Sequence, residues 1–229
     1  MPAALFFDVF GTLVDWRGTI AREARGWFGD AFDGEAFADA WRAEYQPAME
    51  RIRTGGRGYV KLDVLHRENL DLILPRFGFG HATEAERVAM TKVWHRLDAW
   101  PEVTEALERL GERFLLAPMS NGNISLMVDL ARHNGFRWDA VLGAEIAQDY
   151  KPKAGVYLAG CAVLDLAPGR CMMVAAHTSD LVAARAAGLM TAHIARPDEY
   201  GPGLGETEPG EPVDIAARDL AHLAEQFGP

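Results

Sequence analysis

The sequence predicts an α/β fold in which a doubly wound, Rossmann-like parallel sheet carries a helical domain inserted after its first strand. Short continuous apolar runs recur along the chain with helix-like segments between them, a pattern typical of strands buried on both faces of a parallel sheet. Residues 15–100 contain no comparable run, which indicates a separate helical insertion. Alternating strands and helices imply right-handed crossovers, so we expect a parallel sheet.

Four apolar runs are the candidate strands, because each ends at a glycine or at a polar, turn-like segment. They span residues 3–9, 113–119, 171–176 and 190–195. Ligands of such sheets bind in the crevice beyond the carboxyl ends of the strands. Asp8, Ser120 and Asp180 lie at or just after three of these ends and should therefore lie near one crevice.

Amphipathic segments follow the apolar runs. Residues 124–131 are predicted to form a helix that ends at Gly135. Residues 181–187 should form another that ends at Gly188, where a left-handed residue is expected. Residues 215–227 are expected to form the end of a last strand and a closing helix.

Residues 15–100 are predicted to form helices. The expected helices span residues 19–28, 34–53, 58–74 and 83–97. An insertion directly after the first strand is placed to close over the crevice as a cap, with hinges near residues 14–18 and 98–101. We therefore divide the chain into a core domain, residues 1–14 and 101–229, and a helical cap domain, residues 15–100.

Composition excludes some classes of partner. The 229-residue chain has a formal net charge of -10, which opposes broad binding to nucleic acids or anionic membranes. Cys161 and Cys171 lack the spacing of a metal motif, so we expect free thiols in a reducing compartment. There is no N-terminal targeting pattern and no run of ~18 apolar residues. We expect a soluble, cytoplasmic protein.

Four short motifs resemble the haloacid dehalogenase superfamily. They are DVFGTLVDW at residues 8–16, SNGN at 120–123, YKP at 150–152, and Asp180 just beyond the third predicted strand. Their order and spacing are similar to those of the type II (L-)2-haloacid dehalogenases over essentially the whole chain. The resemblance implies a hydrolase that displaces halide from a short 2-haloalkanoic acid.

The resemblance implies that Asp8 is the nucleophile, because a carboxylate at a strand end is held for in-line attack on carbon. Thr12 should hydrogen-bond to Asp8 or to the substrate, and Lys151 should lower the pKa of Asp8. Asp180 is expected to pair with Lys151. Tyr157 matches the family's active-site tyrosine, which orients Lys151 or the substrate. The structural alternatives are a turn-capping Asp8, an exposed Lys151 and a core Tyr157.

Phe10 and Ala176 favour dehalogenation over phosphate ester cleavage. Phosphatases of the superfamily usually carry an aspartate at each position, one to protonate the leaving alkoxide and one to hold magnesium. A departing halide is a weak base and needs no proton donor. Asp8 and Asp180 alone are a thin ligand set for a divalent cation, so we expect no metal or cofactor, and magnesium only in a phosphatase. Phe10 would then line the substrate pocket.

Arg42, Ser120 and Asn121 are the candidate substrate- and halide-binding residues. Ser120 and Asn121 end the second predicted strand, where they could hold a carboxylate or leaving group or form a plain turn. Arg42 matches the halide-binding arginine of the family it resembles. The alternative is an exposed arginine paired with Glu35 or Asp39.

His177 departs from the family pattern. Type II dehalogenases usually carry serine and asparagine where this chain has Ala175 and His177, and those groups help place the hydrolytic water. His177 could position or activate that water, since imidazole both accepts and donates. The alternative is a loop histidine with a structural hydrogen bond. The motifs DWR at residues 15–17 and WHRLDAWP at 94–101 lie at the two predicted hinges and are also not hallmarks of the family. They suggest a subgroup with a smaller substrate, such as a haloacetate, with fluoroacetate among the candidates.

We therefore expect hydrolysis of a haloacetate or L-2-haloacid to a 2-hydroxy acid through an ester on Asp8. Two alternatives remain open: a magnesium-dependent small-molecule phosphatase with Asp8 as phosphoryl acceptor, and a non-catalytic member that binds an acid or a protein. The expected partner is a small anionic substrate, with no nucleic acid and no membrane. The resemblance also suggests a homodimer.

Overall fold

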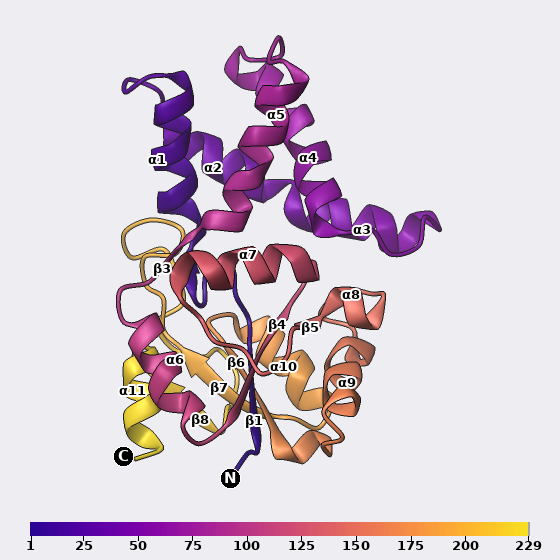
Figure 1. The fold of residues 1–229 in the computed structure, drawn as a ribbon, viewed down its shortest axis with the longest axis vertical. Helices are drawn as coiled ribbons and strands as arrows, with labels where there is room; N and C mark the ends of the chain where they lie inside the picture. Colours follow the sequence, from indigo (N-terminus) through magenta and orange to yellow (C-terminus); the bar gives the residue numbers. More distant parts are fainter. Residues whose placement is uncertain (229) are drawn as a thin grey trace.

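The structure, a computed structural model, describes residues 1–228. At its centre lies a parallel sheet in the order β5-β4-β1-β6-β7-β8 (Figure 1). The predicted strands are confirmed, whereas β5 was not predicted. The strands are β1 (Ala4–Phe7), β4 (Leu115–Ser120), β5 (Leu142–Gly143), β6 (Cys171–Ala175), β7 (Met190–Ile194) and β8 (Ile215–Ala217).

The side chains of β1 alternate between the two faces of the sheet. Leu5 and Phe7 belong to one apolar cluster with α6, α7 and α11, and Ala4 and Phe6 belong to a second with α9 and α10. Helices therefore cover both faces, which confirms the doubly wound fold and explains why β1 is wholly apolar. The core helices are α6 (Val103–Gly111), α7 (Ile124–Asn134), α8 (Ala144–Ala147), α9 (Ala154–Val163), η3 (Pro168–Arg170), α10 (Thr178–Ala186) and α11 (Leu220–Gln226).

The helices between residues 16 and 96 gather at one end of the molecule, beyond the carboxyl end of β1 (Figure 1). Where the chain leaves and re-enters the core, β2 (Val14–Asp15) pairs antiparallel with β3 (Asp98–Ala99), a ribbon that was not predicted. The helices of this layer are α1 (Trp16–Phe28), α2 (Gly34–Ala43), α3 (Tyr45–Gly55), α4 (Leu62–Ile73), η1 (Leu74–Phe77), α5 (Glu84–Thr91) and η2 (Lys92–Arg96).

The prediction of one helix over residues 34–53 is wrong, because α2 and α3 are separate helices that meet at Glu44. Pro47 explains the break: a continuous helix would need its N–H to bond to the carbonyl of Ala43, and proline has no N–H. The other predicted helices of this layer are present with shifted ends, and the one over residues 83–97 finishes in the 3₁₀ turns of η2.

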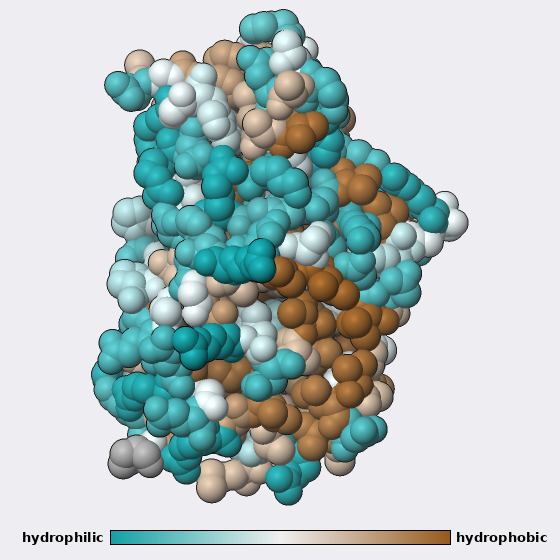
Figure 2. All heavy atoms as spheres, in the orientation of Figure 1, coloured by the Kyte–Doolittle hydropathy of each residue, from teal (hydrophilic) through white to brown (hydrophobic). Residues whose placement is uncertain are grey.

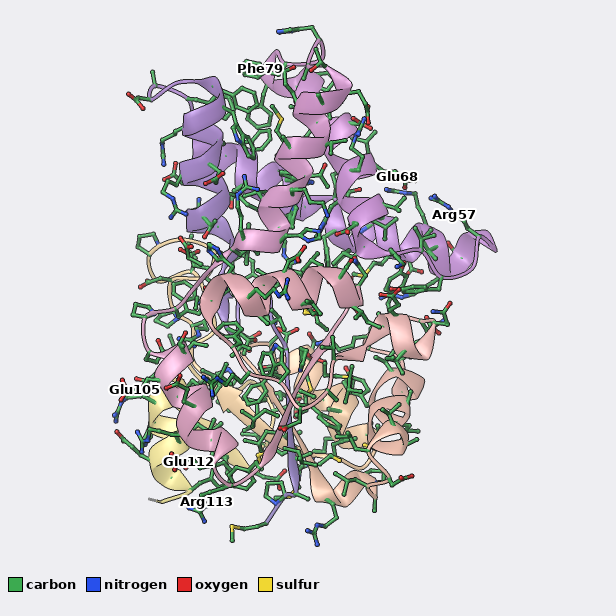
Figure 3. The ribbon with its side chains drawn as sticks, in the orientation of Figure 1. Arg57, Glu68, Phe79, Glu105, Glu112 and Arg113 are labelled. Carbon is green, nitrogen blue, oxygen red and sulfur yellow. The ribbon has the colours of Figure 1, made fainter. Side chains whose placement is uncertain are left out.

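The far end of the helical layer is held by aromatic packing. Phe79, labelled in Figure 3, stacks on Phe28 with ring centroids 3.8 Å apart. Phe32 contacts both rings. At the outer edge, Arg57 and Glu68 form an ion pair at 2.8 Å (Figure 3), which contributes little to stability because both groups are exposed. The three phenylalanine rings pack against the apolar cluster that continues through the helical layer to one face of the sheet.

Candidate active site

Asp8 lies just beyond β1, and its carboxylate is buried. Its N–H donates to the carbonyl of Val174 on β6 at 3.0 Å, which fixes the residue at the strand end. Thr12 Oγ1 donates to Asp8 Oδ2 at 2.9 Å and accepts from the N–H of Ala176 at 2.9 Å. The turn between them depends on Gly11, whose φ of +83° is rarely adopted by other residues. The carboxylate is therefore held in one orientation.

Lys151 bridges two buried carboxylates. Its Nζ donates to Asp8 Oδ1 at 2.8 Å and to Asp180 Oδ2 at 2.5 Å, so the predicted ion pair is present. The hydroxyl of Tyr157 donates to Asp180 Oδ1 at 2.5 Å, and Asn121 Oδ1 accepts from the N–H of Lys151 at 2.8 Å. Tyr157 thus contacts Asp180 and acts on Lys151 only through it.

The charges of this cluster depend on one another. Burial raises the pKa of Asp8, but Lys151 and His177 together outweigh it, so that this pKa lies far below its ordinary value. Burial likewise disfavours charge on Lys151, but Asp180 and Asp8 raise its pKa. The pKa of Asp180 is raised, chiefly by burial, which Lys151 only partly offsets. Asp8 is therefore ionised at neutral pH, and Asp180 is the stronger base of the two carboxylates.

A cavity of about 510 Å³ lies in front of Asp8, between the sheet and the helical layer. Thr12 and Tyr157 are fully buried and do not line the cavity. Ser120 lies outside it too, since its buried hydroxyl accepts from the N–H of Gly122 at 3.0 Å, as in the turn alternative. The predicted residues that line the cavity are Asp8, Phe10, Arg42, Asn121, Lys151, His177 and Asp180.

Arg42 faces the cavity from α2. Its guanidinium lies over the ring of Tyr45, 4.2 Å from the centroid, and 5.5 Å from that of Trp16. Asp39 and Glu35, the alternative partners on the same helix, form ion pairs with Arg17 and Arg25 instead. Among residues 1–228, Arg42 forms no ion pair, and its Nη1 is buried without a hydrogen-bond partner. Arg42 as a whole is only half-buried, but a buried guanidinium nitrogen without an acceptor is costly, which makes this side chain suited to an anionic ligand.

His177 follows β6 and contacts two carboxylates. Its Nδ1 lies 3.2 Å from Asp8 Oδ2, and its Nε2 lies 2.9 Å from Oε2 of Glu199. Burial lowers the pKa of His177, but the hydrogen bonds to Asp8 and Glu199 outweigh it and raise the pKa to about 10. His177 is therefore an imidazolium at neutral pH.

Several residues at the cavity were not identified from the sequence. Arg53 lines it from α3 and donates from Nη2 to the carbonyl of Lys151 at 2.8 Å. Tyr200 and Glu206 line it from the segment between β7 and β8, to which the sequence analysis assigns no site residue, and Glu199 lies in the same segment. Their only signal in the sequence is that they follow a predicted strand, because loops after parallel strands border the ligand crevice.

The part of the chain that the structure describes, residues 1–228, holds no group of three or more His, Cys, Asp or Glu side chains placed to bind a metal ion. None of the helices in these residues has the length and hydropathy that a membrane crossing requires. Cys161 and Cys171 are both buried and free.

Known proteins are similar to the whole chain. The family model described as haloacid dehalogenase-like hydrolase matches residues 2–188. The (S)-2-haloacid dehalogenase of Xanthobacter autotrophicus is 26% identical over 198 residues, which are 86% of this chain and 76% of that protein. The structure of a defluorinating L-2-haloacid dehalogenase is 42% identical with a TM-score of 0.94, over 98% of this chain and 94% of that one. A second L-2-haloacid dehalogenase structure is 42% identical with a TM-score of 0.94, over 99% of each chain.

Proposed function

Because the chain belongs to the haloacid dehalogenase-like hydrolase family, we propose that it hydrolyses the carbon–halogen bond of short 2-haloalkanoic acids, haloacetates and L-2-haloacids among them. The names of its relatives, L-2-haloacid and (S)-2-haloacid dehalogenase, support this substrate class, and one of them is defluorinating. One observation carries the proposal: the ionised Asp8 carboxylate, bonded to Lys151, faces a cavity that also holds the unpaired Arg42.

In the first step, an oxygen of Asp8 attacks C2 of the substrate, and the carbon–halogen electron pair leaves with the halide. The configuration at C2 is inverted, and the substrate is now joined to Asp8 through an ester bond. Arg42 and Asn121, which both line the cavity, are proposed to bind the departing halide. Phe10 lines the same cavity and cannot donate a proton, which a halide does not require.

In the second step, water attacks Cγ of the ester. Asp180 accepts the proton of this water, since burial raises its pKa and Lys151 holds it beside Asp8. The oxygen that attacked C2 leaves with the product, so Asp8 regains a carboxylate with one oxygen from water. Because only the first step inverts the carbon, an L-2-haloacid gives a D-2-hydroxy acid.

We also propose that residues 15–100 act as a cap domain over a core of residues 1–14 and 101–229. Arg42 and Tyr45 line the cavity from the helical layer, whereas Asp8 and Lys151 line it from the sheet. Substrate would enter when the two parts separate about the β2–β3 ribbon, and closure would exclude water during attack on carbon.

A homodimer is proposed from the surface of the core. Figure 2 shows hydrophobic residues gathered over α8 and α9, while the helical end of the same face is largely hydrophilic. The exposed residues Ile146, Leu158 and Val163 belong to these two helices. Exposed apolar residues gathered on one face support association with a second copy of the chain.

Replacing Arg42 with glutamine should lower kcat/KM for chloroacetate by about 10²- to 10³-fold, because the halide loses its charged hydrogen-bond donor. Inhibition by added chloride or bromide should weaken in parallel. Arg51→Gln, at an exposed position of α3, is the matched control and should leave kinetics unchanged. Unchanged kcat/KM in Arg42→Gln would remove Arg42 from the halide site.

Removal of metal ions should leave turnover unchanged. Magnesium requires about six oxygen ligands in near-octahedral geometry, and Ala176 stands where the phosphatases it resembles carry an acid. The measurement is halide release from chloro-, bromo- and fluoroacetate and 2-chloropropionate before and after dialysis against a chelator. Loss of activity on chelation, together with cleavage of phosphate esters, would favour the phosphatase alternative.

A further inference from the structure

Glu199 is a buried carboxylate at the edge of the site. Its side chain is 1% exposed, and its oxygens accept from Trp16 Nε1 at 3.1 Å and from His177 Nε2 at 2.9 and 3.0 Å. Within residues 1–228 it forms no ion pair with a lysine or arginine. Arg196, on the same loop, forms an ion pair with Glu102 at 2.7 Å, and its Nε donates to the carbonyl of Thr12 at 2.8 Å. His177 is thus the cation that compensates Glu199.

The position of Glu199 is tightly fixed. A Cβ at Gly11 would lie 2.0 Å from Glu199 Oε1, so the carboxylate packs directly against the turn that follows Asp8. Trp16 holds it from α1 and His177 from the start of α10. Three separate elements therefore bring this acid to the side of His177 that faces away from Asp8.

These contacts decide the protonation of His177. With Asp8 at Nδ1 and Glu199 at Nε2, both ring nitrogens face carboxylate oxygens, and both carry a hydrogen only in the imidazolium. The other titratable groups nearby are His193 on β7, whose own pKa is lowered by burial, Glu206, which bonds to Thr178, and Tyr200, whose pKa is raised by burial and further by Glu199. An imidazolium has no lone pair with which to accept a proton, so in this state His177 donates hydrogen bonds.

The two oxygens of Asp8 differ in their donors. Thr12 and His177 both approach Oδ2, whereas Lys151 donates to Oδ1. Oδ1, with fewer donors, is the more available nucleophile, and after its attack Oδ2 is the carbonyl oxygen of the ester. When water adds to Cγ, the carbonyl electron pair moves to Oδ2, where donors already point.

We propose that Glu199 is a positioning residue that keeps His177 protonated, so that His177 and Thr12 form the oxyanion site for hydrolysis of the Asp8 ester. This inference rests on the proposed function and replaces the expectation that His177 activates water. The proton of the water passes to Asp180 and then to the departing alkoxide. A second proton is lost to solvent as Asp8 ionises again.

The test is the pH profile of Glu199→Gln, which keeps a hydrogen-bond acceptor and removes the charge. In the unmodified chain, the rate of the hydrolysis step should be independent of pH between about 6.5 and 8, because Glu199 still holds His177 protonated when Asp8 is esterified and carries no charge. In the variant, the pKa of His177 should fall to its ordinary range, and hydrolysis should slow about tenfold per pH unit above roughly pH 7. Halide release in the first turnover should be unchanged, so the ester on Asp8 should accumulate at pH 9 by intact mass.

Asp198→Asn is the matched control, because Asp198 is an exposed acid of the same loop whose side chain accepts from Gly203. Asp198→Asn should show the same pH profile of ester hydrolysis as the unmodified chain. A flat profile in Glu199→Gln, or a rate that rises with pH as a general base requires, overturns the inference. If Glu199→Gln does not fold, the ¹⁵N shifts of the His177 ring in the parent chain decide: protonation at pH 8 supports the inference, and a neutral ring overturns it. Failure of the parent chain to release halide would instead refute the proposed function.

Discussion

Replacing Asp8 with alanine should abolish halide release, with a loss of at least about 10⁴-fold, because the attacking atom itself is removed. The variant should remain folded, since Lys151 keeps Asp180 and His177 keeps Glu199 as charged partners. Single-turnover halide release and a thermal melt on the same sample measure both effects. Turnover by a folded Asp8→Ala protein would show that the nucleophile is a different group.

Replacing Lys151 with methionine should damage both activity and stability. Asp8 and Asp180 would then share a buried site without the cation that bonds to each of them, so the pKa of at least one must rise. We expect a loss of about 10³-fold in kcat/KM and of about 3–5 kcal/mol in the free energy of unfolding. The residual rate should increase with rising pH, as Asp8 regains its charge.

The matched control for this variant is Lys153→Met. Lys153 is half exposed, pairs with Asp149 at 2.8 Å, and should change the free energy of unfolding by no more than about 0.5 kcal/mol. Urea unfolding of both variants compares a buried with an exposed lysine two positions apart. Equal stability of the two would contradict a buried, bridging role for Lys151.

The central strands could be predicted from the sequence because a strand buried on both faces must be a continuous apolar run. Residues 4–7 and 171–175 are wholly buried, and the hydropathy pattern records this directly. The two residues of β5 are too few to give such a pattern. The break at Glu44 was open to prediction, since Pro47 lies three residues further on and cannot continue a helix.

The site was predictable where a residue lies at a strand end or in a motif. Asp8, Lys151 and Asp180 come together because their strands and loops end at one edge of the sheet. Glu199 could not be predicted from the sequence, because it lies in a loop without a periodic pattern and contacts Trp16, which is 183 positions away in the chain. For Ser120, the position at a strand end indicated a ligand-binding residue. Its hydroxyl instead accepts a hydrogen bond from the N–H of Gly122.

Isotope incorporation into Asp8 tests the central claim, the ester intermediate, most directly. The protein is incubated in ¹⁸O-water with excess haloacid through many turnovers, and the peptide that contains Asp8 is then weighed by mass spectrometry. Label in Asp8, and from it in the 2-hydroxy acid, is the result that an ester on Asp8 requires. Label in the product with none in Asp8 would mean that water attacks C2 directly, and would contradict the mechanism.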